Sequence, residues 1–385
     1  MRKAEWYDAA AGPHRNLADA RDKVEHQAKR KMFAHTFAAK TVVAFEPVLR
    51  ENLQHVPRFE LYVDRSFGQL LYGHKLGCFD RGNDMLDAES REGKIYRVPF
   101  IDSLLNATMI NNLLAIFSHI LPVAKRLAKH HSYKKKGVDW ENIVYHNTKK
   151  RMANPDPEDD LFTRMLQDNK GQALNVPFGE IMSECSSMMN AGTETTTAAM
   201  TNTIFLLYTH PVVLQKLREE IDSAAPRNEI PAYDVMSRLP YLRACIEEPL
   251  RVRPASSFGL PRIVPAGGRE IAGKFVQEGV IVSVPTYSLL RDENVFKNAT
   301  QYNADRWLTE DAGEKKKMMT NHLPFSTGPR ACIGRNIAYF EQTVVIATIF
   351  KFFDCKVEEG FQLETQERFN SNPGDLPMEV TRRAS

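Results

Sequence analysis

Apolar residues recur at the spacing of a helix over most of this chain. The longest such run covers residues 177–209, where a proline opens the run and a His-Pro pair closes it. Further apolar stripes at helical spacing occupy residues 211–221 and 337–353. The period changes between residues 255 and 292, where glycines separate short alternating runs that are typical of small hairpins. The pattern therefore predicts a mainly α protein with small β-sheets, in the α+β class.

The composition is that of an ordinary globular protein. Of 385 residues, 43% are hydrophobic and 26% are charged, and 51 Lys and Arg against 48 Asp and Glu leave a net charge of +3. This balance is too even to indicate binding to nucleic acid, so no nucleic-acid partner is expected. The length suits about two to three average domains or one large fold. We predict a single domain over residues 1–385.

Cysteine usage and hydropathy bear on the cellular compartment. The five cysteines form no C-x-x-C pair and show no disulfide-like spacing, which favours a reducing environment. The chain has no uninterrupted apolar run of about 18 residues, and it opens with polar residues instead of a signal peptide. We therefore expect this chain to carry no membrane anchor and to be soluble in the cytoplasm.

The most informative stretch is residues 324–334, Pro-Phe-Ser-Thr-Gly-Pro-Arg-Ala-Cys-Ile-Gly, directly before an apolar helical run. Its Gly-Pro pair predicts a tight turn. Cys332 then lies just ahead of a helix, where the positive end of the helix dipole and unpaired N–H groups favour a thiolate. Such a thiolate could be a nucleophile or a metal ligand, and a buried structural cysteine is the alternative.

A second unusual stretch lies in the middle of the helix predicted for residues 177–209. It reads Ala-Gly-Thr-Glu-Thr-Thr-Thr over residues 191–197. A glycine followed by β-branched residues is poor material for a helix, and the glycine alone costs up to about 1 kcal/mol. Local inconsistency of this kind often marks a functional site, and a kinked structural helix is the alternative.

The order Phe-x-x-Gly-x-Arg-x-Cys-x-Gly resembles the haem-ligand loop of the cytochromes P-450, the haem-thiolate monooxygenases. The resemblance implies haem b as cofactor, with Cys332 as the axial ligand of its iron, a ligand that favours O–O cleavage. It also implies that Arg330 pairs with a haem propionate and that Phe325 shields the sulfur. Gly334 would let the backbone approach the porphyrin closely.

Residues 191–197 resemble the oxygen-activating motif of the same family. By this resemblance, the small residues Ala191 and Gly192 let haem and O2 come close. The acid–alcohol pair Glu194 and Thr195 would deliver protons during the activation of O2.

A third resemblance concerns Glu248 and Arg251, which match the family's Glu-x-x-Arg motif. The two side chains share one face of a helix, where they can form an ion pair. Residues 302–307 resemble the family's Pro-Glu-Arg-Trp segment and would bring Arg306 into the same network, which locks the haem-binding core. Because Pro249 lies inside the first motif and the second departs from the usual residues, we expect a kink near Pro249 and a slightly loosened network.

Residues 16–37 have the pattern of a helix with a basic face, and they resemble the helix that crosses one face of the haem in fungal members. His26 and Arg30 would reach the propionates, because their i,i+4 spacing places them on one helix face. A solvated basic helix is the alternative. In the family this helix follows a membrane anchor and a sheet-rich lobe, so we expect this chain to be a fragment or a reduced variant without them.

The finer resemblance is to the fungal benzoate para-hydroxylase group, through residues 21–26, 257–262 and 282–287. It implies a small aromatic acid or a related secondary-metabolite intermediate as substrate, into which one oxygen atom from O2 is inserted. The residues expected to contact the substrate are Ser256, Ser257, Phe258 and Phe369.

The resemblance also implies partners and leaves alternatives open. Electrons would come from NADPH through NADPH-cytochrome P-450 reductase, docked on the basic face near Cys332. Longer relatives would lie at the cytoplasmic face of the endoplasmic reticulum membrane. One alternative is a haem-thiolate isomerase or lyase, which can dispense with the proton relay of Glu194 and Thr195. The other is a non-catalytic remnant whose missing lobe leaves a large apolar patch exposed.

Overall fold

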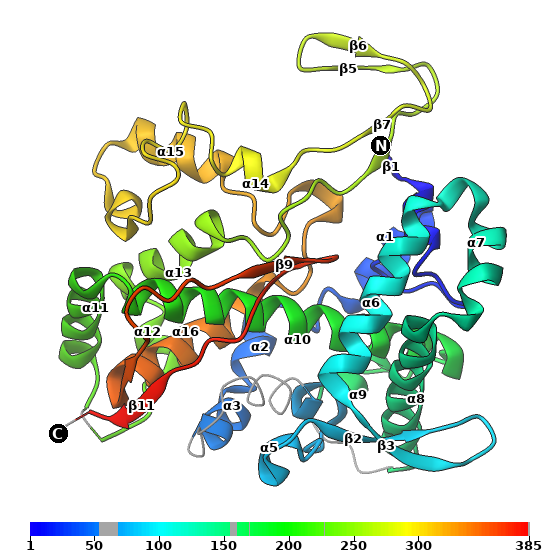
Figure 1. Ribbon diagram of the computed structural model, residues 1–385, viewed down its shortest axis with the longest axis horizontal. Helices are drawn as coiled ribbons and strands as arrows, with labels where there is room; N and C mark the ends of the chain where they lie inside the picture. The colour runs from blue at the N-terminus through cyan, green and yellow to red at the C-terminus, as the bar shows by residue number, and fades with distance from the viewer. Residues whose placement is uncertain (54–67, 155–159, 169, 227, 384–385) are drawn as a thin grey trace. The chain divides into compact units, whose positions relative to one another are not determined.

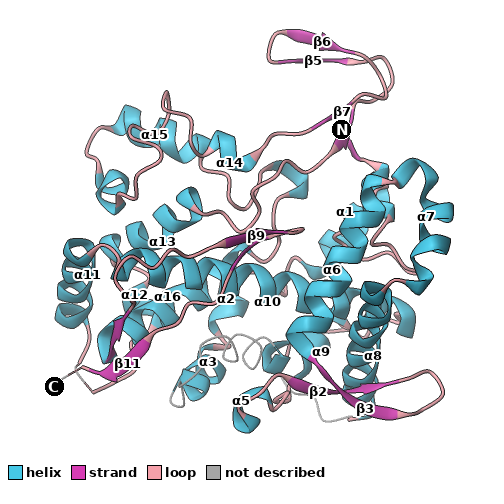
Figure 2. Ribbon diagram, viewed as in Figure 1, coloured by secondary structure: helices cyan, strands magenta, loops and turns pink. Residues whose placement is uncertain are grey.

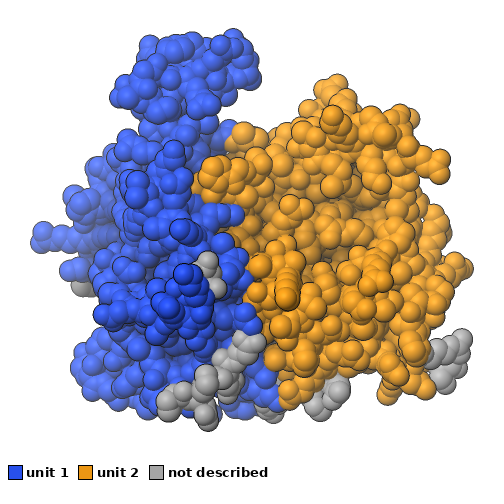
Figure 3. All heavy atoms as spheres, turned by 180° about the vertical axis from the view of Figure 1, so that it is seen from behind, with its two compact units in different colours: residues 1–36, 57–193, 260–283 blue, residues 37–56, 194–259, 284–385 orange. Residues whose placement is uncertain are grey.

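A computed structural model describes residues 1–53, 68–154, 160–168, 170–226 and 228–383 of the chain. The chain divides into two compact units, which Figure 3 distinguishes by colour. Unit 1 comprises residues 1–36, 57–193 and 260–283, and unit 2 comprises residues 37–56, 194–259 and 284–385. The single domain expected over residues 1–385 stays a prediction.

Unit 1 is mainly helical, with small antiparallel sheets (Figures 1 and 2). Its described helices are η1 (Glu5–Asp8), α1 (Lys23–Phe33), α5 (Cys78–Arg81), α6 (Phe100–Ile116), η2 (Ser118–Ile120), α7 (Leu121–Leu127), η3 (Ala128–His130), α8 (Ser132–Ala153), α9 (Leu161–Met165) and the first part of α10 (Phe178–Tyr208). Its strands are β1 (Arg2–Lys3), β2 (Met85–Glu89), β3 (Ile95–Pro99), β4 (Arg262–Ile263), β5 (Arg269–Ile271), β6 (Lys274–Val276) and β7 (Ile281–Val282).

Helix α1 is shorter than the helix predicted for residues 16–37. It begins after Asp22, the N-cap residue, whose backbone is extended. The side chain of Asp22 accepts from the N–H groups of Val24 and Glu25. The residues before it form a separate turn, because the side chains of Asn16 and Asp19 each accept from the other's N–H, at 3.0 and 2.9 Å. The prediction was wrong about the start of the helix, since two polar side chains satisfy the backbone locally.

Unit 2 is built around α16 (Arg335–Phe352), whose residues 344–347 are fully buried. Helices α2, α3, α11, α12 and α13 all contact α16, so its buried surface fixes the loop that precedes it. The other described helices of this unit are α2 (Ala39–Val43), α3 (Glu46–Leu53), the rest of α10, α11 (Pro211–Ala224), α12 (Tyr233–Met236), α13 (Pro240–Val252), α14 (Thr286–Leu289), η4 (Ala304–Leu308), α15 (Ala312–Asn321) and η5 (Gly328–Arg330). Its strands are β8 (Phe353–Lys356), β9 (Thr365–Glu367), β10 (Ser371–Pro373) and β11 (Glu379–Arg382).

The predicted fold class is confirmed, because helices dominate and the strands pair into antiparallel sheets of two or three strands (Figure 2). Helix α10 confirms the long helix expected at residues 177–209. The hairpins expected between residues 255 and 292 are present as β4 paired with β7 and β5 paired with β6. In the last of these, the turn residues Ala272 and Gly273 both have positive φ, at 50° and 74°.

Across the described part of the chain, no single helix has both the length and the apolar character needed to span a membrane. By those two criteria alone one bent pair of helical segments passes, Phe100–Ile116 with Ser118–Leu127, which turn by 84° at their junction.

Candidate active site

The loop before α16 presents Cys332 as an exposed side chain. Two residues with left-handed backbone bend this loop, Ser326 at φ 58° and Gly328 at φ 74°. The N–H of Cys332 donates to the carbonyl of Phe325 at 2.9 Å and closes the loop on itself. The predicted turn at the Gly-Pro pair is therefore confirmed, and it holds Cys332 just before Gly334, the N-cap residue of α16.

This position suits a thiolate with free space beside it. The first N–H groups of α16 and the positive end of its dipole favour a negative sulfur. A Cβ atom added at Gly334 would lie 3.9 Å from the Cys332 Sγ, so the glycine keeps that space clear of a side chain. The ring of Phe325 packs on the ring of Tyr339, with their centroids 4.9 Å apart, and anchors the start of the loop to α16.

The residues of this loop fit a haem group better than a bare metal ion. Among the described residues, no group of three or more His, Cys, Asp or Glu side chains could hold an ion. Haem iron is held mainly by the porphyrin, and one cysteine thiolate is an established axial ligand for it. Arg330 lies half-buried two residues before Cys332, and its planar fork of donors suits a propionate.

Unit 1 carries the other side chains that were expected to face haem. His26 is buried and Arg30 is half-buried on α1, one helical turn apart. Ala191 is exposed although it lies in the middle of the 31-residue helix α10, and Gly192 next to it has no side chain. That these residues contact haem stays a prediction.

Glu194 opens the part of α10 that belongs to unit 2, and its side chain is buried at 6% exposure. The side-chain amide of Asn372 donates to Oε1 of this carboxyl at 2.7 Å, while Oε2 has no hydrogen-bond partner among the described residues. Burial raises the pKa of Glu194 above its ordinary value, although the amides of Asn372 and Asn370 oppose the shift. An acid of this kind keeps a proton closer to neutral pH than an exposed glutamate does.

A hairpin of β9 and β10 brings together most of the residues expected to contact a substrate. Ser257 Oγ and Ser371 Oγ donate to the same carboxylate oxygen of Glu367, at 2.7 and 3.0 Å. The ring of Phe369, in the turn of this hairpin, meets the ring of Phe258 edge to face, with their centroids 5.8 Å apart. The structure thus places Ser257, Phe258 and Phe369 at one locality of unit 2, with Ser256 half-buried in the same segment.

The expected network around Glu248 is fully formed. Oε1 of Glu248 accepts from Arg251 Nη2 at 2.7 Å and from Arg306 Nε at 3.0 Å. Oε2 accepts from Arg251 Nε at 3.0 Å and from Trp307 Nε1 at 2.9 Å, a donor that sequence reasoning missed. The expected loosening is not observed, because α13 continues through Pro249 and the remaining guanidinium donors of Arg251 reach backbone carbonyls at 2.6 to 3.0 Å.

A second buried acid, Glu247, also escaped sequence reasoning. Its carboxylate lies 2.8 Å from His322 Nε2, accepts from the Tyr339 hydroxyl at 2.9 Å and pairs with Arg243 at 2.6 Å. Burial by itself would raise the pKa of Glu247, but the hydrogen bond with His322 and the charge of Arg243 outweigh burial and lower the pKa to about 2. The signal available in the sequence was the pair of consecutive glutamates at residues 247 and 248. In the structure each of the two carboxylates has its own set of donors.

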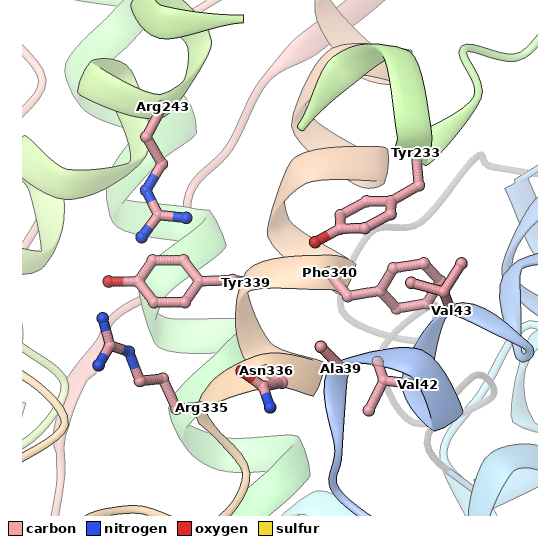
Figure 4. Close-up of a pocket in the computed structure, with 9 residues that line it drawn as sticks. All are labelled: Ala39, Val42, Val43, Tyr233, Arg243, Arg335, Asn336, Tyr339 and Phe340. Atoms are coloured by element: carbon pink, nitrogen blue, oxygen red, sulfur yellow. The ribbon is translucent and has the colours of Figure 1, made fainter. Parts of the chain in front are cut away.

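A cavity of about 220 Å³ adjoins this acid in unit 2 (Figure 4). Figure 4 shows Arg243 and Arg335 on either side of the Tyr339 ring, and their guanidinium carbons lie 3.7 and 5.6 Å from its centroid. The remaining lining residues are Ala39, Val42, Val43, Tyr233, Asn336 and Phe340. Because Arg335 is exposed three residues after Cys332, the surface next to the cysteine loop is positively charged.

Comparison with known proteins identifies similar sequences and folds. The family model described as Cytochrome P-450 matches residues 76–376. Benzoate 4-monooxygenase bphA of Aspergillus niger is 28% identical, over 99% of this chain and 80% of that protein. The cytochrome P-450 monooxygenase efuB of Hormonema carpetanum is 30% identical, over 88% of this chain and 69% of that protein.

A solved structure agrees with this comparison at the level of the fold. The heme domain of cytochrome P-450DA superposes with a TM-score of 0.80 and covers 100% of this chain and 84% of that chain. Its sequence identity is 19%, so the likeness concerns the fold and not the substrate.

Proposed function

The chain belongs to the cytochrome P-450 family, and we propose that it inserts one oxygen atom from O2 into a C–H bond of a small aromatic acid or a related secondary-metabolite intermediate. Its relatives are named monooxygenases, and haem b is the cofactor of the family. The observation that carries the proposal is the Cys332 loop, which presents one exposed thiol at the start of a buried helix. The isomerase or lyase alternative is not favoured by the names of these relatives.

Haem bound through Cys332 supplies the chemistry that activates O2. In our proposal the protein holds this group by charge and by shape. Arg330, His26 and Arg30 are the proposed partners of the propionates, since guanidinium and imidazole donors suit carboxylates. Phe325 covers the sulfur, while Gly334 and the pair Ala191 and Gly192 leave the space that a flat ring needs.

We assign the handling of protons to Glu194 and Thr195. A buried carboxyl with a raised pKa can take up a proton near neutral pH and release it to a neighbouring hydroxyl. The oxygen of Glu194 that lacks a partner among the described residues is the atom available for this exchange. Thr195, half-buried at the next position of α10, supplies the hydroxyl.

The proposed substrate class rests on two supports. A benzoate 4-monooxygenase is among the similar proteins, at 28% identity. In addition, Phe258 and Phe369 offer aromatic edges at the hairpin, where an aromatic substrate can pack. The hydroxyls of Ser256 and Ser257 are the proposed polar contacts, although in this structure Ser257 donates to Glu367.

We propose that electrons arrive from NADPH through NADPH-cytochrome P-450 reductase, on the basic face beside the cysteine loop. Arg335 and Lys40 are exposed there, and Arg243 contributes to the same cavity. An acidic partner surface would be steered to such a face, with an association rate that falls as salt rises. For the longer relatives this encounter would occur at the cytoplasmic face of the endoplasmic reticulum membrane.

The proposal is tested by the carbon monoxide difference spectrum of the reduced, haem-loaded protein. A strongly red-shifted Soret band in the wild type, lost in Cys332→Ala, would support thiolate ligation. Benzoate added to the ferric protein should then shift the Soret band to shorter wavelength. A wild type without the red-shifted band would contradict the proposal and favour the non-catalytic remnant.

Thr195→Ala provides the second test, because it removes the hydroxyl and leaves the haem ligand in place. We expect normal haem binding and a product yield per NADPH reduced by about a hundredfold, the lower end of the range for loss of a proton-transfer group. Thr203→Ala is the matched control, since the hydroxyl of this buried threonine of the same helix donates to the carbonyl of Ala199. Full product yield from Thr195→Ala would contradict the proton-relay role.

A further inference from the structure

The contact between Asn372 and Glu194 joins two parts of unit 2 that lie 178 residues apart in the chain. Glu194 belongs to α10, and Asn372 is the middle residue of β10, which forms a hairpin with β9 (Figure 1). No feature of the motif at residues 191–197 points to this partner. The contact is therefore a property of the folded chain and not of the motif.

We propose that Asn372 is a positioning residue for the proton relay: its side-chain amide fixes one oxygen of Glu194 and leaves the other oxygen to carry the proton. This inference rests on the monooxygenase function proposed above. Oε1 is 2.7 Å from the amide nitrogen, and Oε2 is buried without a hydrogen-bond partner among the described residues. The two oxygens of one carboxyl thus have different surroundings.

An amide is the suitable donor for an acid that must change its charge. The NH2 group of asparagine can donate to a carboxylate oxygen and equally to the carbonyl oxygen of a neutral carboxylic acid. Glu194 can therefore gain and lose a proton on Oε2 while Oε1 stays in place. A lysine or arginine at the same point would hold the carboxylate permanently charged and would oppose protonation.

The charges around Glu194 are consistent with this role. The polar groups that act on it come from the hairpin: Asn372 and Asn370 by hydrogen bonding, and Arg368 by its charge from the hairpin turn. All three lower the pKa of Glu194, and burial raises it by more. Removing the Asn372 amide should therefore raise the pKa of Glu194 further.

The hairpin is held firmly enough to act as a positioning element. The N–H of Ser371 donates to the carbonyl of Ala255 at 2.8 Å. Beyond Asn372, the N–H of Gly374 donates to the carbonyl of Glu364 at 2.9 Å. Because residues on both sides of Asn372 are tied down, its amide has little freedom to leave Glu194.

The experiment compares Asn372→Ala, Asn372→Asp and the conservative Asn372→Gln with the control Ser371→Ala, whose hydroxyl points to Glu367. The first readout needs no turnover: the infrared carbonyl band of protonated Glu194, identified by its loss in Glu194→Gln, is titrated against pH. We expect the midpoint to move to higher pH in Asn372→Ala and further in Asn372→Asp, where a second negative charge disfavours the carboxylate. Ser371→Ala should keep the wild-type midpoint.

The second readout is product formed per NADPH in the haem-loaded protein as a function of pH. Asn372→Ala should lose about tenfold, with its pH profile displaced in the same direction as the infrared midpoint, and Asn372→Gln should restore part of the loss. A wild-type midpoint and pH profile in Asn372→Ala would overturn the inference. A wild type that lacks the red-shifted carbon monoxide band would instead overturn the proposed function, so the two failures are distinguishable.

Discussion

Glu248 and Glu194 are both buried glutamates of unit 2, and the structure surrounds them in opposite ways. Glu248 accepts from two guanidinium groups and one indole, so each of its oxygens has at least two charged or strong donors. Oε1 of Glu194 accepts from the amide of Asn372, and Oε2 has no partner among the described residues. Two guanidinium groups thus give the first acid its counter-charge, whereas within the described part of the chain the second has an amide donor on one oxygen and no cation bound to it.

Two further acids extend this comparison. Glu247 has donors from His322, Tyr339 and Arg243, so it resembles Glu248. Glu341 on α16 is fully buried, and neither of its oxygens has a hydrogen-bond partner among the described residues. Burial raises the pKa of Glu341 to about 8. The four buried carboxyl groups thus form a series, from one whose oxygens all have hydrogen-bond donors to one whose oxygens have none among the described residues. Stability measurements can test this series.

The largest effect is expected for Glu248→Ala. Removal of the carboxylate leaves Arg251, which is fully buried, and Arg306 without their counter-charge. Breaking a buried pair by removing one partner costs about 3–5 kcal/mol. Urea unfolding of the haem-loaded protein should show this loss, whereas the control Glu219→Ala, at an exposed site of α11, should change stability by less than about 0.5 kcal/mol. A loss below about 1 kcal/mol would show that the network does not lock unit 2.

A smaller effect, with a distinct pH dependence, is expected for Glu341→Gln. In the folded protein the Glu341 pKa is about 8, against an ordinary value of 4.5, so the folded state binds more protons than the unfolded state between these pH values. Wild-type stability should therefore fall as pH rises from 4.5 to 8. Glu341→Gln cannot ionise and should reduce the fall by roughly 1–3 kcal/mol.

Urea titrations of wild type and Glu341→Gln at pH 5 and pH 8 measure this difference. Glu314→Gln, at an exposed position of α15, is the matched control for the chemical change. If the free energy of unfolding falls equally with pH in wild type and in Glu341→Gln, the prediction that Glu341 is buried without hydrogen-bond partners is wrong.

The smallest effect is expected for His322→Ala, which removes one donor from Glu247. Because the Glu247 pKa is lowered to about 2, this acid stabilises the fold above pH 4.5, and the stability is lost as pH falls toward 2. Without His322 the Glu247 pKa should rise, so acid unfolding should begin at higher pH, with a cost of about 1 kcal/mol at pH 7.

Circular dichroism during acid titration follows the change in His322→Ala. His322→Gln keeps a donor at this position and should restore most of the wild-type acid midpoint. An unchanged acid midpoint in His322→Ala would show that Arg243 and Tyr339 alone are enough to keep the Glu247 pKa low.

The sequence was most informative where the chemistry depends on neighbouring residues. The turn before Cys332, the bounds of α10 and the ion pair of Glu248 with Arg251 all involve short spacings, so each could be predicted. The loosening expected from Pro249 was wrong, because the helix ends three residues later and the donors of Arg251 are satisfied by tertiary contacts.

Other features could not be predicted, for physical reasons. Glu341 lies within the apolar stripe of residues 337–353, and that pattern alone does not predict a buried acid. Its burial depends on helices from distant parts of unit 2. The start of α1 was set by side chains that cap the backbone locally, which a helical pattern does not show. The roles assigned to the haem-facing and substrate-facing residues stay predictions until the experiments above are made.

The hydrogen bond between Glu194 and Asn372 also has a consequence for the order in which the protein is made. A ribosome that adds about 5–20 residues per second needs roughly 10–35 s to travel the 178 residues between the two partners. During that interval the carboxyl of Glu194 can be synthesised and folded into its helix without its amide partner. The proposed proton relay therefore gains its amide partner only after the cysteine loop has been synthesised, because Asn372 follows Cys332 in the chain.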